Sequence, residues 1–315
     1  YYITTAFKGS LGKFLAGFFA IAITLALGFF GCMVQSNSIG STCQTAFGIP
    51  SWTVGLILVV ICGFIFLGGI KRLASVTEKI VPIMAALFLV GSLLLLAVRI
   101  KYIPATFGMI FRYAFQPQAI IGGSVGAALK IALTQGAKRG LFSNEAGMGS
   151  TPHAHARAVV KNPHCQGLAA MISVFIDTFI VLNLTVFSIL TTNSLSSGKD
   201  GIMLTQYAFS TVFGSFGDIF IAVCLLFFAF STILGWHFFG SINVKHLFGK
   251  KGMVPYSVLV AVFIVVGSML KVDLVWTLAD FFNGLMVIPN ALALLALSGV
   301  VASICKKYSS EKSDN

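Results

Sequence analysis

Seven apolar runs divide this chain of 315 residues, and each is long enough to cross a bilayer as a helix. They cover residues 11–38, 51–70, 80–98, 167–191, 217–240, 254–270 and 285–305. A bilayer core about 30 Å thick needs roughly 20 apolar residues in helical form. Only 10% of the residues are charged, which is too few to cover a water-exposed surface. The sequence therefore predicts an all-α polytopic membrane protein that faces a lipid bilayer.

One further stretch, residues 119–160, is rich in glycine and interrupted. It is either one span followed by a loop or one broken span, and in both cases it crosses once. The chain then has about eight crossings and both termini on one side. With those termini inside, the inner segments carry thirteen Lys and Arg residues and the outer segments five. Because cytoplasmic loops retain Lys and Arg, this orientation is favoured, and we expect a multi-pass protein of the plasma membrane, the inner membrane of a bacterium.

The net charge of +12 does not predict nucleic-acid binding, because the basic residues are scattered between apolar runs and form no continuous stripe. Two outer segments, 102–118 and 272–283, mix aromatic side chains with charges, which is typical of interfacial helices or surface hairpins with aromatic anchors. The chain starts at Tyr1 rather than Met. We expect residues 1–315 to form one transmembrane domain in the C-terminal part of a longer protein.

The stretch from Gly140 to Pro152 offers the most chemistry. Transporters often bind substrate where a helix is interrupted, because unwound backbone leaves N–H and C=O groups free. Its glycines permit such a break, and Ser143 and Asn144 can cap the half-helix that follows. Phe142, Ser143 and Asn144 are therefore candidates to line a pocket for an amino acid. A capped cytoplasmic loop is an equally good interpretation of the composition.

Polar residues within or near other apolar runs give further candidates. Gln35 needs a hydrogen-bond partner at depth, either a substrate or a neighbouring helix. Ser231 and Thr232 offer oxygen ligands to a sodium ion and Trp236 can wall an apolar pocket, although adjacent hydroxyls also bond their own helix carbonyls. Asp177 is the only carboxylate well inside a predicted span. Its role would be that of a cation ligand, a proton carrier or a member of a structural ion pair.

Other chemistry finds little support in the sequence. His153 and His155 point to different faces of a helix, so we predict no metal site. No Ser/His/Asp constellation, phosphate loop or pair of catalytic carboxylates is present, so we predict no catalytic residues and no enzyme activity. An ion channel would need a continuous polar lining or a ring of charges, and no repeated filter-like segment is visible.

Several segments together resemble the alanine or glycine:cation symporter family. The most specific is the string from Arg139 to Gly147, RGLFSNEAG. The others are YYI at 1–3, MVQSNSI at 33–39, GGIKR at 68–72, FIDT at 175–178 and NGLM at 283–286.

The resemblance implies a partial leucine-transporter-type fold of two inverted repeats, with sodium as the coupling ion and no other cofactor. The first two helices of the first repeat would precede Tyr1. It also implies sodium-coupled symport of small neutral amino acids such as alanine and glycine. The substrate-facing residues would be Gln35, Phe142, Ser143, Asn144 and Trp236, and the sodium-facing pair Ser231 and Thr232. Proton-coupled amino-acid transport and an inactive transporter fragment are the alternatives. Lys138 and Arg139 speak against the broken-helix version of the glycine-rich stretch, because they would lie toward the bilayer midplane unless they face an aqueous vestibule.

Overall fold

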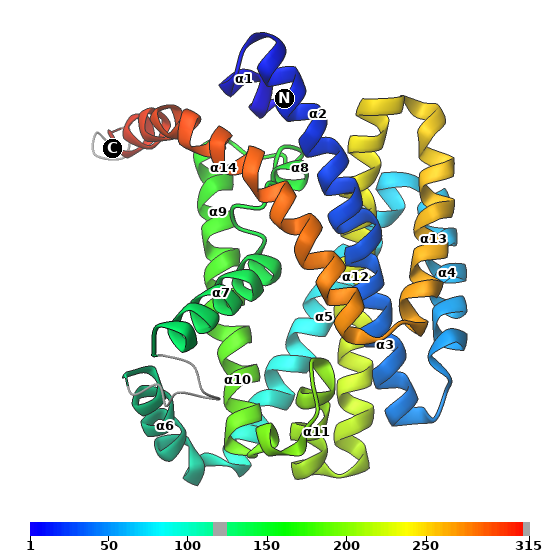
Figure 1. Ribbon diagram of the computed structural model, residues 1–315, viewed down its shortest axis with the longest axis vertical. Coiled ribbons are helices and arrows are strands. Elements are labelled where there is room, and N and C mark those ends of the chain that lie inside the picture. Colours follow the sequence, from blue (N-terminus) through cyan, green and yellow to red (C-terminus); the bar gives the residue numbers. More distant parts are fainter. Residues whose placement is uncertain (116–124, 311–315) are drawn as a thin grey trace.

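The computed structural model describes residues 1–115 and 125–310, without the side chains of residues 70, 71, 115, 125–128, 309 and 310. Residues 119–124 of the glycine-rich stretch and residues 116–118 of the predicted interfacial segment lie outside the described residues. Over the described part the chain forms helices and no strands (Figure 1). The first half contains α1 (Tyr2–Ala6), α2 (Gly9–Ile23), the π-helix η1 (Thr24–Gly31), α3 (Cys32–Phe47), α4 (Ser51–Leu67), α5 (Gly69–Val98), η2 (Ile100–Tyr102), α6 (Ile103–Phe115) and α7 (Val125–Asn144). The second half contains α8 (Pro152–His155), α9 (Pro163–Phe175), the π-helix η3 (Ile176–Val181), α10 (Leu182–Thr191), η4 (Ser194–Ser197), α11 (Ile202–Phe213), α12 (Ser215–Phe248), η5 (Lys250–Gly252), α13 (Met253–Met269) and α14 (Val272–Ser310).

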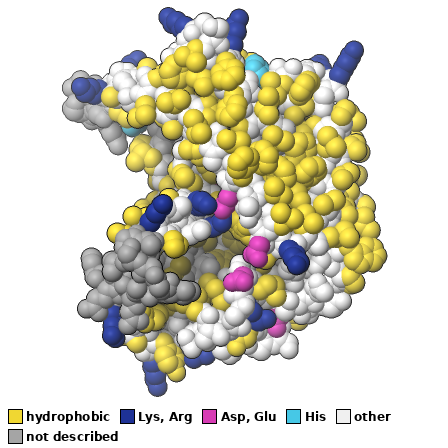
Figure 2. All heavy atoms as spheres, viewed as in Figure 1, with side chains coloured by type: hydrophobic (Ala, Val, Ile, Leu, Met, Phe, Trp, Pro, Cys, Tyr) yellow, Lys and Arg dark blue, Asp and Glu magenta, His cyan; other side chains and the backbone are white. Residues whose placement is uncertain are grey.

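The predicted apolar runs are confirmed as helices. Six helical segments of the described chain are long and apolar enough to cross a membrane: Gly9–Phe47, Arg72–Val98, Pro163–Thr191, Ser215–Phe248, Lys250–Met269 and Val272–Tyr308. The remaining predicted run, 51–70, begins with the shorter apolar helix α4. Hydrophobic side chains cover most of the upper and right parts of the face in Figure 2. The molecule is therefore a polytopic helical membrane protein.

The glycine-rich stretch is interrupted, as predicted. Helix α7 ends at Asn144, where Glu145, Gly147 and Gly149 adopt positive φ values of 56°, 87° and 88°. Only four residues are helical again in α8 before α9 begins at Pro163. In Figure 1, α6 lies at the lower end, α7 and α8 bring the chain upward, and both termini lie at the upper end. The arrangement agrees with a single crossing by this stretch.

Two sets of three helices follow the same order along the chain: a long helix, a helix of 17 residues and a helix with a proline inside it. The first is the continuous helix Gly9–Phe47, then α4 with 17 residues, then α5 with Pro82 inside it. The second is α12, then α13 with 17 residues, then α14 with Pro289 inside it. Corresponding members run in opposite directions (Figure 1). This order is what two inverted repeats require, and it agrees with the fold that the resemblance implies.

The prediction of an interfacial segment at 272–283 is wrong. These residues begin the long helix α14, and Val275 and Ala279 are fully buried against Met33 and Val34 of α3. The charges Asp273 and Asp280 lie on the other faces of the same turns. By contrast, α6 is a separate helix that exposes several aromatic side chains, and its interfacial position stays a prediction.

Candidate functional site

A pocket of about 380 Å³ lies between α3, the chain that leads into α11, α12 and α14. Gln35, half-buried, lines it together with other polar residues of α3. The first turns of α14 contribute Val272 and Trp276 to the opposite wall. The lining residues are Val34, Gln35, Asn37, Ser38, Ser41, Asp200, Gly201, Ile202, Met203, Thr205, Leu225, Val272 and Trp276. Two neutral amides, three hydroxyls and one carboxylate therefore meet around a space of small-molecule size.

Three aromatic rings lead from this pocket into the protein. Phe142, near the end of α7, has its ring centroid 4.9 Å from that of Trp276 and 5.3 Å from that of Trp236 on α12. Trp236 is only 3% exposed. The predicted Gln35, Phe142 and Trp236 thus belong to one region, which Trp276 joins together. Trp276 was not among the predicted site residues, because its segment was assigned to the surface.

Trp236 is held on two sides. A Cβ atom added at Gly31, the last residue of η1, would lie 2.7 Å from the indole ring, so glycine is what lets the ring lie there. The indole Nε1–H donates to the Glu145 carboxylate with a separation of 2.5 Å. The second carboxylate oxygen accepts from the Ser150 hydroxyl. Glu145 is therefore a second carboxylate within a crossing, and its bond to Trp236 spans 91 residues of sequence.

The unwound backbone after α7 is anchored by α14. The Asn290 amide donates to the carbonyl oxygen of Gly147 over 2.7 Å, and the Tyr2 hydroxyl donates to the Asn290 oxygen over 2.7 Å. At Gly149 an added Cβ would meet both Asn290 and Phe19 at under 3.0 Å. Because a positive φ also disfavours other residues, glycine is doubly required at that position. At least one of the carbonyl groups predicted to be free is thus already bonded to a side chain.

Ser143 and Asn144 face away from the Gln35 pocket. The Ser143 hydroxyl donates to Asp177 over 2.7 Å, and the Asn144 amide donates to the Thr178 hydroxyl over 3.1 Å. Both partners lie in η3. The prediction that these residues cap the next half-helix is wrong, because the Asn144 oxygen accepts from the backbone of Ala146 in the turn and α8 begins only at Pro152.

Ser231 and Thr232 bond to their own helix. Both hydroxyls donate to the carbonyl oxygen of Phe228, over 2.9 and 2.8 Å, and the Ser231 hydroxyl also lies 3.5 Å from the Met84 sulfur. This is the local bonding that the sequence left open as an alternative. The hydroxyl oxygens keep lone pairs, so their role as cation ligands stays a prediction.

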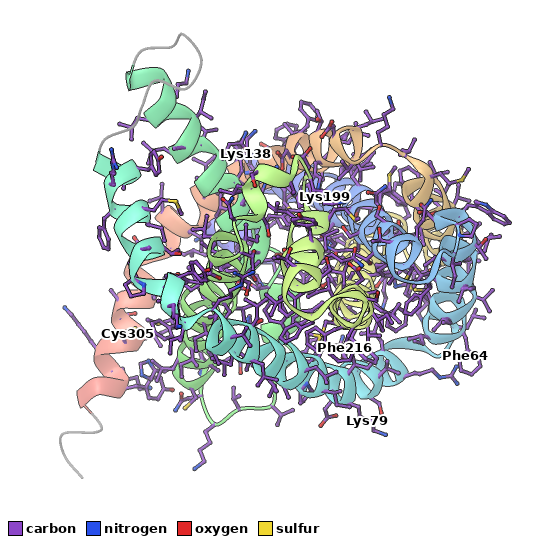
Figure 3. All side chains as sticks on the ribbon, turned by 90° about the horizontal axis from the view of Figure 1, so that it is seen from below. Phe64, Lys79, Lys138, Lys199, Phe216 and Cys305 are labelled. Carbon is purple, nitrogen blue, oxygen red and sulfur yellow. The ribbon has the colours of Figure 1, made fainter. Side chains whose placement is uncertain are left out.

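Lys138 and Arg139 of α7 share a partner on α14, the helix whose first turns line the pocket. Arg139 donates to Asp280 of α14 over 2.8 Å, and Lys138 lies 3.7 Å from the same oxygen. The guanidinium also lies 4.1 Å from the centre of the Trp276 ring. The two basic side chains are 46% and 41% exposed. In Figure 2, acidic and basic side chains gather beside a hollow on this face, and Figure 3 shows Lys138 and Lys199 on the same side of the molecule. These positions agree with an aqueous vestibule.

Within the described residues, no group of three His, Cys, Asp or Glu side chains is placed to hold a metal ion. His153 and His155 have separate partners, as their spacing predicts. His153 contacts Asn243 on α12, whereas His155 contacts Gln166 on α9.

An interrupted helical segment that packs on long apolar helices beside a pocket is typical of secondary transporters. The sequence model of the sodium:alanine symporter family matches residues 1–315, and the chain belongs to this family of transporters.

Three curated relatives illustrate the likeness. The chain is 38% identical over 307 residues to a probable sodium/glutamine symporter, GlnT, of Bacillus subtilis, which covers 97% of this chain and 63% of the relative. It is 37% identical over 302 residues to the sodium/alanine symporter AgcS of Methanococcus maripaludis, and the match covers 95% of this chain and 66% of AgcS. It is 33% identical over 306 residues to a sodium/proton-dependent alanine carrier protein of a Bacillus species, and the match covers 91% of this chain and 68% of that relative. The chain thus spans about two thirds of the length of these relatives.

Proposed function

We propose that the complete protein carries a small neutral amino acid across the plasma membrane, the inner membrane of a bacterium, together with sodium. The observation that supports this best is the meeting of Gln35 and Trp276 at one small pocket. Behind Trp276 the ring of Phe142 contacts both Trp276 and Trp236. An amide can form a hydrogen bond with either charged group of an amino acid. The aromatic rings limit the size of the substrate side chain that the pocket can hold. The names of the relatives, which include sodium/alanine and sodium/glutamine symporters, support the same class of substrate.

Each predicted residue then has a proposed role. Gln35 binds the charged groups of the substrate, and Phe142 and Trp236 wall the pocket. Ser143 and Asn144 act through η3, because their side chains bond Asp177 and Thr178. Ser231 and Thr232 supply two oxygen ligands to sodium.

Uptake of labelled alanine into proteoliposomes, with and without a sodium gradient, tests the coupling. We expect uptake only with the gradient. Uptake that ignores sodium and follows pH would instead support proton coupling, the alternative that the sequence left open. No alanine uptake under either gradient would overturn the assignment of the substrate.

The site is tested by Gln35→Ala. A hydrogen bond to a charged group contributes about 1.5–3 kcal/mol, so we expect the KM for alanine to rise about tenfold or more. Gln44→Ala is the matched control, since Gln44 lies on the same helix, is exposed and bonds only the Ser51 hydroxyl in the described structure. An equal effect of both substitutions would remove Gln35 from the site.

The cation ligands are tested by Thr232→Val, which removes an oxygen and keeps the shape. We expect the sodium concentration for half-maximal uptake to rise while the KM for alanine at saturating sodium stays the same. Thr211→Val is the control, because the Thr211 hydroxyl makes the same type of bond to the carbonyl four residues earlier on an exposed part of α11. If sodium dependence is unchanged in Thr232→Val, the ligand assignment is wrong.

A further inference from the structure

The Glu145 carboxyl group is an ionisable group that none of the assigned roles uses. It lies in the unwound part of a crossing, in a left-handed conformation with φ 56°. One oxygen accepts from the indole N–H of Trp236 and the other from the hydroxyl of Ser150. Ser150 is fully buried and Trp236 nearly so. Both hydrogen-bond donors are neutral.

No basic group balances this carboxylate among the described residues, whose salt bridges all involve Asp280. The titratable groups on the elements around Glu145 bond other partners. These are Tyr2 of α1 with Asn290, Lys138 and Arg139 of α7 with Asp280 of α14, His155 of α8 with Gln166, Asp177 of η3 with Ser143, and His237 of α12 with Ser257.

His153, also on α8, is the nearest candidate for a positive charge, and its hydrogen bonds keep it neutral. Its Nδ1 lies 2.9 Å from the carbonyl oxygen of Ser150 and must donate to it. Its Nε2 lies 3.0 Å from the amide nitrogen of Asn243, which also donates to the carbonyl of Phe239. That second bond fixes the orientation of the amide, so Nε2 must be an acceptor. An imidazolium would place two donors against each other.

An ionised carboxylate in a membrane interior, bonded only by neutral donors, costs much free energy. Protonation removes the charge and needs one of the two partners to accept a hydrogen bond. Trp236 can only donate, whereas the Ser150 hydroxyl can rotate to accept. The proton therefore belongs on the oxygen that faces Ser150.

We propose that Glu145 is a proton-binding site whose charge sets how firmly Trp236 is held. When Glu145 takes up a proton on the oxygen facing Ser150, the Ser150 hydroxyl changes from donor to acceptor. Trp236 then donates to a neutral acid, and that bond is about half as strong as one to a carboxylate. Because Trp236 packs against Phe142, protonation loosens the wall of the substrate pocket. The transport consequence rests on the proposed function, whereas proton binding itself does not.

The fluorescence of Trp236 tests the site directly. The complete protein would carry Trp52→Phe and Trp276→Phe, which leaves one of its three tryptophans within residues 1–315; any tryptophan outside them would also be replaced. We expect its emission to change with pH in the absence of alanine and sodium, in parallel with a carboxylic-acid band in the infrared spectrum. Glu145→Gln keeps an oxygen for Trp236 and a donor for Ser150. It should abolish the titration and lock the emission at its low-pH value.

Two controls make the outcome decisive. Asp177→Asn changes the carboxylate of η3 and should leave the titration intact. If Glu145→Gln does not fold, Ser150→Ala must move the titration midpoint, whereas Ser143→Ala must not. A titration that survives Glu145→Gln, or an emission that is independent of pH in the parent, overturns the proposal.

Alanine uptake separates this proposal from the proposed function. We expect uptake by Glu145→Gln to lose its dependence on pH while keeping its dependence on sodium. A protein whose Trp236 titrates through Glu145 but which takes up no alanine would contradict the proposed substrate and leave the proton site standing. Unchanged pH dependence of uptake in Glu145→Gln would show that this proton does not act on transport.

Discussion

Gly31 shows how one missing side chain can place an aromatic ring. Any Cβ there would lie 2.7 Å from two atoms of the Trp236 ring. A rigid ring that is bonded to Glu145 and packed on Phe142 cannot move aside freely. The conformation of Trp236 therefore depends on a glycine from another crossing.

We predict that Gly31→Ala destabilises the protein by about 1–3 kcal/mol, as overpacking of a close contact does, and weakens alanine binding. Thermal unfolding in detergent and the KM for uptake are the measurements. Gly17→Ala on α2 is the control, because an added Cβ there meets nothing within 4 Å, and alanine favours a helix over glycine by up to about 1 kcal/mol. Equal effects of the two substitutions would contradict the role of Gly31.

Individual site residues could be predicted only where a local pattern marked them. Gln35 is a polar residue in an apolar run, and Phe142 belongs to a glycine-rich motif, so both stand out as candidates in the sequence. Trp276 was missed because nearby charges indicated a surface segment, and its contact with Phe142 joins residues far apart in the chain. Glu145 was part of the motif, but no local pattern reveals a bond to a tryptophan 91 residues away.

Helices α7 and α14 are joined at the element scale by Arg139 and Asp280. The pair is bonded over 2.8 Å, but the Arg139 side chain is 41% exposed, so solvent screens much of the attraction. Arg139 also rests on Trp276. The contact thus links the interrupted crossing to the helix that forms the opposite wall of the pocket.

We predict a coupling free energy of up to about 1 kcal/mol between Arg139 and Asp280. It can be measured as a double-mutant cycle with Arg139→Gln and Asp280→Asn, using thermal unfolding. The coupling should shrink at high salt, because exposed ion pairs are screened. A coupling of several kcal/mol, or one indifferent to salt, would contradict a half-exposed pair.

Helix α13 approaches α3 so closely that only glycine fits at position 267. An added Cβ would lie 2.6 Å from the Cα of Met33, which belongs to the backbone and cannot rotate away. Small residues allow membrane helices to pack in this way. We predict that Gly267→Ala costs about 1–3 kcal/mol of stability, measured by thermal unfolding. Gly63→Ala on α4, where the added Cβ has no neighbour within 4 Å, should be harmless.

Helix positions were largely predictable, because apolar length alone defines a crossing. The ends of the helices were less so. The apolar run 217–240 lies within a helix that continues to Phe248, and the first run ends at residue 38 although its helix reaches Phe47. Polar residues continue a helix when neighbouring helices supply partners, as the backbone of α13 does for Asn37. The π-helical segments have no compositional signature and were not predicted.

The whole molecule has its two described ends on the same side (Figure 1). The two ends lie on the same side only because the interrupted stretch counts as a crossing. The excess of Lys and Arg in the segments on that side predicts that it is cytoplasmic.

Cysteine labelling tests this orientation. After replacing the exposed Cys165 and Cys305 by Ser, we predict that Lys199→Cys reacts with an impermeant maleimide in intact cells. Lys250→Cys should react only after permeabilisation, because it precedes α13 at the other end of the molecule. Both substituted positions are exposed. Reaction of both cysteines from the same side would contradict the topology.

The π-helical segment η1 determines how the protein would respond to deletions and insertions within it. It lies between α2 and α3, so Gln35 comes after it on one continuous helix. Removing a single residue from η1 would restore regular winding and turn everything beyond it by about 100°. Gln35 would then turn away from the pocket even though no residue that lines the pocket had been altered. Insertions and deletions in this short segment should therefore be far less tolerated than substitutions in the loops.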